Sequence, residues 1–199
     1  MKKEKLSVRD LCITALFAAV TAICAQIAIP IPFSPVPISF GMVGLYTASI
    51  FLPPRCAVLS QVCYLVLGAA GLPVFGGFKG GMGALLGPTG GYLMVYPIMA
   101  AIVSWALNSR WALQKKYGQK RVLINGTIAI CAAHFLLYLG GTIWLCGTTG
   151  NTFMAGLSLA VFPYIPLDIV KIVFCSVAVI PLRGRLMGAG FLALTPEKI

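Results

Sequence analysis

The chain has 199 residues, of which 59% are hydrophobic and only 10% are charged. Soluble domains carry about 25% charged residues, so this composition, with a mean hydropathy of +0.96, excludes an ordinary soluble domain and indicates a surface that faces lipid. The net charge of +11 at pH 7 is explained by membrane topology, and we expect no nucleic-acid partner.

Six apolar segments predict six membrane-crossing helices in a single domain that comprises residues 1–199. A helix rises about 1.5 Å per residue and the hydrocarbon core is about 30 Å thick, so most of the segments are long enough to cross it. The second and third are short, and we expect them to be tilted, broken or partly extended. The predicted fold is an all-α integral membrane protein with spans at residues 11–29, 38–52, 56–72, 88–107, 122–146 and 156–181.

Lys and Arg residues predict the orientation of these spans. Apart from Lys79 and Lys171, all of them lie before span one, between spans two and three, between spans four and five, or after span six. Six alternating spans place these segments on one side, which the positive-inside rule makes the cytoplasm, with both termini. Residues 1–10 resemble the start of a signal peptide, but no small-residue cleavage site follows, so we expect the first span to be retained.

The first span contains two pairs of alanines, Ala15/Ala19 and Ala18/Ala22, each spaced four residues apart. On a helix, small residues at this spacing let another helix backbone approach closely. The approaching helix can belong to this chain or to another protein, and the pattern alone does not decide between them.

The next connection, IPIPFSPVP (residues 29–37), contains four prolines. They prevent a helix and favour an extended, polyproline-like path. The segment is apolar although it is expected at the outer face of the membrane. It is therefore either an ordinary loop or a lid that folds back over a site and lines it.

The segment GLPVFGGFKGGMGALLGPTGGY (residues 71–92) has nine glycines and a single charge, Lys79. Irregular backbone is tolerated at membrane depth only where it is buried in protein or lines a cavity. Glycines also permit close approach to a ligand and leave amide N–H groups free to donate. The phosphate-loop patterns of nucleotide-binding proteins are absent. The segment is either a flexible outer loop or part of a binding site.

A carboxylate and an ammonium group lie inside the last span, in FPYIPLDIVKIVF (residues 162–174), at Asp168 and Lys171. Charges within a membrane cost about 2.5–3.5 kcal/mol on insertion scales and indicate function by default. The alternative is a mutual ion pair, because residues three apart share a helix face. Helix rise places both in the outer half of the bilayer, together with Tyr92 and with His134 and Tyr138 of span five.

An enzyme is not expected. No serine-nucleophile motif of the G-x-S-x-G type is present, and the spans offer one acidic residue and one histidine, too few for a catalytic metal. The seven cysteines form no C-x-x-C pair, so we expect neither a metal site nor a cofactor.

The stretches GLPVFGGFKGG, LLGPTGGYL and PYIPLDIVK resemble the BioY family, the biotin-specific S-components of energy-coupling-factor (ECF) vitamin transporters. PVPISFGMVGLYTASIFLPPR is similar to the same family, and the resemblance extends over about residues 11–182. It implies a six-helix protein of a prokaryotic cytoplasmic membrane that captures biotin for uptake. It also implies a transmembrane coupling subunit and two cytoplasmic ATPases as partners. The alternatives are an S-component for riboflavin or thiamine and a ligand-free membrane interaction protein.

The resemblance also implies roles for single residues. The family's binding acid and lysine correspond to Asp168 and Lys171, which can meet the N–H groups and carbonyl of the biotin ureido ring. The family's docking motif in the first helix corresponds to Ala15 and Ala19.

The family's glycine-rich loop corresponds to residues 76–91. The biotin carboxylate can be bound by amides of this loop, by Lys79 or by Lys171, and the sequence leaves this choice open. For His134, an ordinary hydrogen-bonded helix position is the alternative to ligand contact. Besides Asp168, Lys171 and Lys79, the expected substrate contacts are Phe33, Phe75, Phe78, Gly80, Gly81, Tyr92, His134 and Tyr138.

Overall fold

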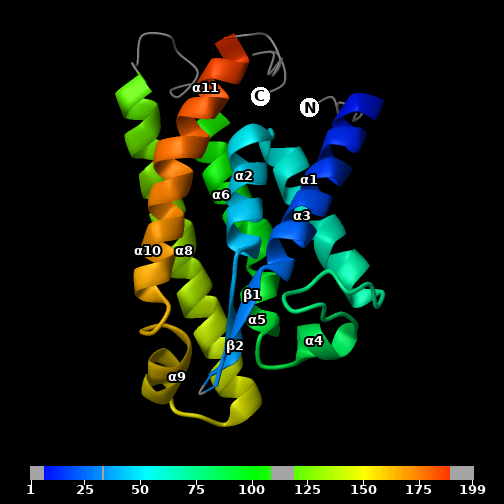
Figure 1. Cartoon of the computed structure of the whole chain (residues 1–199), viewed down its shortest axis with the longest axis vertical. Helices are drawn as coiled ribbons and strands as arrows, with labels where there is room; N and C mark the ends of the chain where they lie inside the picture. The colour runs from blue at the N-terminus through cyan, green and yellow to red at the C-terminus, as the bar shows by residue number, and fades with distance from the viewer. Residues whose placement is uncertain (1–6, 33, 109–118, 189–199) are drawn as a thin grey trace, which may run out of the picture.

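The computed structural model describes residues 7–32, 34–108 and 119–188, which are mainly helical (Figure 1). Helix α1 (Val8–Gln26) begins at a capping box, in which Ser7 Oγ accepts the N–H of Asp10 and the Asp10 carboxylate accepts the N–H of Ser7. An antiparallel hairpin follows, made of β1 (Ala28–Ile31) and β2 (Ser34–Ser39).

The remaining elements are helices of very different length. The first two, α2 (Gly41–Phe51) and α3 (Pro54–Ala69), precede the glycine-rich segment, which contains the short helices α4 (Met82–Leu86) and α5 (Gly90–Met94). Helix α6 (Tyr96–Asn108) continues from α5, and α8 (Gln119–Thr149) is the longest helix described. The chain then forms α9 (Phe153–Ala160), α10 (Ile165–Phe174), the π-helical turn η1 (Cys175–Val179) and α11 (Ile180–Gly188).

Four helical segments of the described residues are long and apolar enough to cross a membrane: Val8–Gln26, Gly90–Asn108, Gln119–Thr149 and Ile165–Leu186. They correspond to the first, fourth, fifth and sixth predicted spans. The second and third, α2 and α3, are shorter apolar helices, as their sequences predicted. At about 1.5 Å per residue, the 11 residues of α2 cover only about half of a hydrocarbon core.

The proline-rich connection is extended, as predicted, but it forms paired strands rather than a polyproline path, so the fold is not purely helical. Ala28 pairs with Ser39 and Ile29 with Ile38 across the hairpin. The hydrophobic helix α1 ends at Gln26, before this hairpin, and not at residue 29.

The predicted last span, residues 156–181, is also divided differently. Its first residues belong to α9, a separate helix that packs against α8 and β2. The membrane-length segment begins at Ile165, and Pro166 lies in its first turn, where the missing N–H of proline removes no helical hydrogen bond. Pro166 therefore lies at the start of this helix and does not interrupt it.

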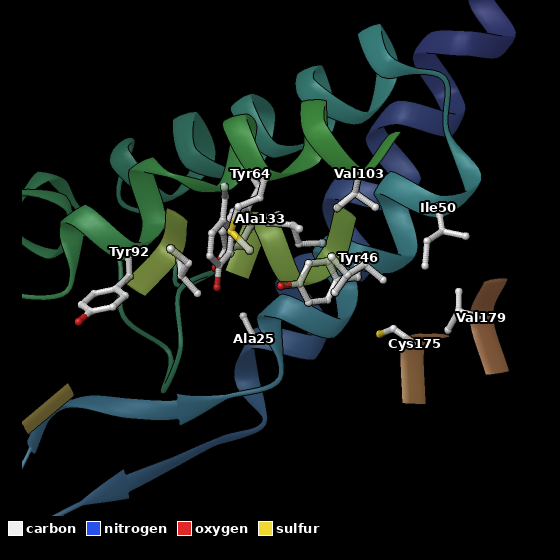
Figure 2. Packing of buried hydrophobic residues seen from close by; sticks show 14 of the residues in the cluster. Ala25, Tyr46, Ile50, Tyr64, Tyr92, Val103, Ala133, Cys175 and Val179 are labelled. Atoms are coloured by element: carbon white, nitrogen blue, oxygen red, sulfur yellow. The ribbon is translucent and has the colours of Figure 1, made fainter. Parts of the chain in front are cut away.

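The core is formed where α2 is enclosed by α1, α6 and η1. Tyr46, Val103 and Ala133, from α2, α6 and α8, converge in the buried cluster shown in Figure 2. Close packing of α1 on α2 depends on Gly44, because a Cβ at this position would lie 2.7 Å from the Cα of Thr21. Small residues thus bring these helices together.

Arg183, one of the basic residues used to predict orientation, is buried in the bundle and not exposed. Its guanidinium donates to the Leu107 carbonyl at 2.8 Å and to Asn108 Oδ1 at 2.6 Å. The Asn108 amide in turn donates to the Leu52 carbonyl at 3.2 Å. These bonds join the end of α6 to α11 and to the connection between α2 and α3.

Candidate ligand-binding site

A cavity lies between the hairpin, the glycine-rich segment and helices α3, α5, α6, α8 and α10. Its wall is mostly apolar and aromatic, with a few convergent polar groups, which is the usual composition of a small-molecule site. The lining residues are Val36, Pro37, Ser39, Met42, Tyr64, Phe75, Gly76, Lys79, Ala84, Thr89, Tyr92, Leu93, Tyr96, Leu137, Tyr138, Ala160, Tyr164, Asp168 and Lys171.

Asp168 is the centre of a hydrogen-bond network at the cavity wall and is only 3% exposed. Lys171 Nζ donates to its Oδ1 at 2.9 Å. The hydroxyl of Tyr138 donates to its Oδ2 at 2.7 Å, and His134 Nε2 lies 3.1 Å from the same oxygen. The carboxylate is thus an ion-paired and heavily hydrogen-bonded group in an apolar interior, where such partners offset the cost of desolvation.

Lys171 is held by a main-chain group as well as by Asp168. Its ammonium donates to the Ser39 carbonyl at 2.8 Å, and it lies 5.5 Å from the centre of the Phe40 ring. Ser39 ends β2, so the lysine connects α10 to the base of the hairpin. The Ser39 hydroxyl also donates to the Ala25 carbonyl at 3.3 Å, which ties the hairpin base to the last turn of α1.

His134 lies behind Asp168 and does not line the cavity. Its Nδ1 is 2.8 Å from the hydroxyl of the fully buried Tyr46. The ring is 88° from the plane of Tyr138, with 4.6 Å between the ring centres. Of the two roles expected for His134, its contacts are those of a hydrogen-bonded helix residue and not those of a ligand contact.

Aromatic rings form another part of the cavity wall. Phe75 packs edge-on against Tyr64, with 5.4 Å between ring centres, and Tyr64 stacks on Tyr96 at 6.2 Å. The hydroxyl of Tyr92 is 3.4 Å from Thr142 Oγ1. Rings of this kind present flat apolar surface with a polar edge, which suits a small ligand with a heterocyclic head.

The glycine-rich segment approaches the cavity through a tight loop closed by two main-chain hydrogen bonds between Phe75 and Lys79. Gln26, at the end of α1, holds this loop: its amide donates to the Pro73 carbonyl at 3.2 Å, and its Oε1 accepts the N–H of Phe78 at 2.9 Å. Lys79 is exposed and lies at the junction between the cavity and a neighbouring glycine-lined hollow.

The structure brings Asp168, Lys171, Tyr138, Phe75, Tyr92 and Lys79 of the expected contacts to the cavity wall. It places three others, in addition to His134, elsewhere. Phe78 is 71% exposed, Gly80 lines the neighbouring hollow, and Gly81 donates its N–H to the Gly68 carbonyl. Phe33 lies outside the described residues.

Sequence reasoning missed several tyrosines. Of the tyrosines in residues 7–32, 34–108 and 119–188, only Tyr46 is not on the cavity wall, and it binds His134. Tyr64, Tyr96 and Tyr164 were not predicted. The available signal was the tyrosine side chain itself, because a ring with a polar edge in an apolar span suits the wall of a small-molecule site.

The two alanine pairs of α1 face in different directions. Ala18 is buried in the core, whereas Ala15 and Ala19 are exposed on the outer face of the helix. The Ala15/Ala19 pair is therefore accessible to another protein.

Comparisons with known proteins agree on one family. Residues 1–187 match the model of the BioY family. The chain is 33% identical to a probable biotin transporter BioY of Pyrococcus horikoshii, over 90% of this chain and 99% of the relative. It is 33% identical to the biotin transporter BioY2 of Lactococcus lactis, over 84% of this chain and 86% of that protein. It also matches the crystal structure of the S-component for biotin from an ECF-type ABC transporter, with a TM-score of 0.76 and 29% identity over 89% of this chain and 92% of the other.

Proposed function

The chain belongs to the BioY family, and we propose that it captures biotin in the cavity beside Asp168 as the substrate-binding subunit of an ECF-type ABC transporter. Relatives named as biotin transporters and a solved biotin S-component support the substrate. No catalytic step is required of this chain, and we assign it none.

The observation that carries the proposal is the set of hydrogen-bonding positions left open by the Asp168–Lys171 pair. A carboxylate has about four acceptor positions, and Lys171, His134 and Tyr138 occupy three of those on Asp168. An ammonium group has three N–H donors, and Asp168 and Ser39 accept two of those on Lys171. One acceptor and one donor therefore remain side by side at the cavity wall.

A cyclic urea complements this arrangement. Its N–H and its carbonyl lie on one edge of the ring, so the N–H can donate to Asp168 Oδ1 while the carbonyl accepts from Lys171. The thioether ring and the valeryl chain then contact the aromatic wall of Phe75, Tyr64 and Tyr92.

Lys79 and the amides near it are the groups best placed for the biotin carboxylate. The single open donor of Lys171 is taken by the ureido carbonyl, whereas Lys79 is exposed at the mouth of the cavity. A solvent-exposed ion pair contributes only about 0.2–1 kcal/mol. We therefore expect Lys79→Met to weaken biotin binding by no more than about fivefold and to leave biotinamide binding unchanged. If competition titrations showed that Lys79→Met weakens binding of biotin and of biotinamide equally, the biotin carboxylate would have to be bound by another group.

We further propose that the chain is one multi-pass domain, with six passes, in the cytoplasmic membrane of a prokaryote. The starts of α1 and α8, the connection of α2 to α3 and the end of α11 lie at one end of the molecule (Figure 1). These segments border most of the Lys and Arg residues of the sequence, which favours placing that end in the cytoplasm. The hairpin then lies on the outer side, where it completes the short pass of α2.

The partners in this proposal are a transmembrane coupling subunit and two cytoplasmic ATPases, with the docking surface on α1 around the exposed Ala15 and Ala19. The match to an S-component of an ECF-type ABC transporter supports this assembly.

The deciding experiment is a titration of the detergent-purified chain with labelled biotin, with excess riboflavin as competitor. We expect saturable binding that riboflavin does not displace. Asp168→Asn should weaken it at least tenfold, or about 1.4 kcal/mol, because the acceptor for the ligand N–H and the charge opposite Lys171 are weakened together. Asp10→Asn makes the same change of charge in the capping box of α1 and should bind normally. Normal binding by Asp168→Asn would exclude this site.

A further inference from the structure

Tyr46 and His134 form a buried polar pair behind the ligand site. Tyr46 is fully buried and His134 is 4% exposed, and neither lines the cavity. The Tyr46 hydroxyl, the imidazole and the Asp168 carboxylate nevertheless form one continuous chain of hydrogen bonds, of 2.8 Å and 3.1 Å. We propose that Tyr46 and His134 are positioning residues that hold Asp168 as an anionic acceptor, with His134 neutral and its proton on Nε2. This role rests on Asp168 binding the ligand as proposed above.

The hydroxyl of Tyr46 decides where the imidazole proton lies. In the described part of the chain, His134 Nδ1 is the hydrogen-bond partner of this hydroxyl. A buried O–H without an acceptor costs about 1–3 kcal/mol, so Tyr46 donates and Nδ1 accepts. The proton of the neutral ring is then on Nε2 and points at Asp168 Oδ2.

The charges around Asp168 favour the neutral ring. Lys171 already provides one cation 2.9 Å from the carboxylate. Among the described residues, the imidazole also contacts the hydroxyl of Tyr46 and the ring of Tyr138, and neither of these groups is charged. An imidazolium would leave two cations and one anion in a buried group, and an unpaired buried charge costs several kcal/mol. The neutral tautomer keeps the group at zero net charge.

The pair has a direct consequence for recognition. Nε2–H and the Tyr138 hydroxyl together occupy Oδ2, so the ligand finds its acceptor at Oδ1, next to the ammonium of Lys171. Asp168 Oδ1 and the Lys171 ammonium bind the adjacent N–H and carbonyl of the ligand. Their availability therefore depends partly on Tyr46 and His134, which the ligand does not touch.

The chain has a single histidine, so the tautomer can be measured by NMR without assigning resonances to individual residues. The full chain would be labelled with ¹⁵N-histidine, purified in detergent through a histidine-free tag and studied by NMR at pH 7. We expect one protonated nitrogen, Nε2, and one unprotonated nitrogen, Nδ1, whose resonance shifts in Tyr46→Phe. A doubly protonated ring, or a proton on Nδ1, would overturn the assignment. This measurement needs no ligand, so its failure is distinct from failure of the biotin site.

Two substitutions of His134 then separate positioning from packing. Gln can donate an N–H from about the position of Nε2, so His134→Gln should bind biotin within about threefold of the native chain. His134→Phe keeps a ring but loses the donor, and we expect at least a tenfold loss of affinity. Thermal unfolding of both proteins controls for the fold. Equal affinities of the Gln and Phe variants, at similar melting temperatures, would show that the donor has no role.

Discussion

At the scale of single residues, two glycines create the space that the aromatic wall occupies. A Cβ at Gly68 of α3 would lie 2.0 Å from the ring of Phe75, and a Cβ at Gly141 of α8 would lie 2.2 Å from the ring of Tyr92. Both distances are far below van der Waals contact, so the rings can pack against these helices only where a side chain is absent. Their role is steric, since both lie in regular helix.

Helix α8 offers a matched test of this role. Gly141→Ala should weaken biotin binding at least threefold, because the Tyr92 ring has to leave its place on the cavity wall. Gly147 lies in the same helix, and a Cβ added there would meet no other atom within 4 Å, so Gly147→Ala should bind biotin normally. It should also unfold at a higher temperature, because Ala is favoured over Gly in helices by about 1 kcal/mol. If the two alanine variants bind equally well, Tyr92 does not need its present position.

The residues of the site that could be predicted from the sequence are charged residues within apolar segments. Asp168 and Lys171 stand out in an apolar span because a charge there needs a reason. Tyr46 and Ser39 do not stand out, since tyrosine is common in membrane proteins and Ser39 acts through its main chain. Their roles depend on contacts between segments about 90 and 130 residues apart in sequence, with His134 and with Lys171. Local patterns contain no information about such pairs.

At the scale of elements, the last turn of α1 holds both irregular segments that line the cavity. Gln26 binds the glycine-rich loop at the Pro73 carbonyl and the Phe78 N–H, and the Ala25 carbonyl accepts the hydroxyl of Ser39 at the base of the hairpin. The backbone of these segments is thus fixed from a regular helix. Such support is what keeps a loop-built site in one geometry.

Gln26→Leu tests this support. The loop loses two hydrogen bonds, each worth about 0.5–1.5 kcal/mol, so we expect biotin affinity to fall between about fivefold and about 140-fold. Amide hydrogen exchange in residues 73–81 should accelerate while exchange in α6 stays the same. Gln26→Glu, which retains the acceptor for the Phe78 N–H, should lie between Leu and the native chain. Unchanged exchange and affinity in Gln26→Leu would mean that the loop is held by other contacts.

The hairpin is the element that sequence patterns failed to identify. Prolines are normally read as evidence against strands, because they cannot donate to a ladder. In a two-stranded sheet, however, every strand is an edge strand, and the paired positions Ala28, Ile29 and Ile31 of β1 are not prolines. The extended path was predictable from the prolines, whereas its pairing depends on where α1 ends and α2 begins.

At the scale of the whole molecule, α1 has one face that packs in the core and another that is exposed on the outside. Its inner face buries Ala18 and Ala25, while Ala15 and Ala19 remain exposed. The helix proposed for docking therefore also supports the ligand site through its last turn.

Ala15→Leu combined with Ala19→Leu should leave biotin binding unchanged and abolish ATP-driven uptake, because the larger side chains prevent close approach of the coupling subunit. Uptake would be measured in cells that express the complete transporter. Ala132→Leu, which enlarges an exposed alanine on α8, is the control and should transport normally. Normal uptake by the α1 variant would place the docking surface elsewhere.

The acceptor that Ser39 offers to Lys171 is a peptide carbonyl, so no exchange of the amino acid at position 39 can remove it. Evolution is free to vary that side chain without touching this contact, provided that the hairpin keeps its path. Alignments detect retained side chains and therefore leave this partner of the lysine invisible. The position of the strand that leads into α2 is a better guide than the identity of residue 39 for recognising distant homologues with the same pocket.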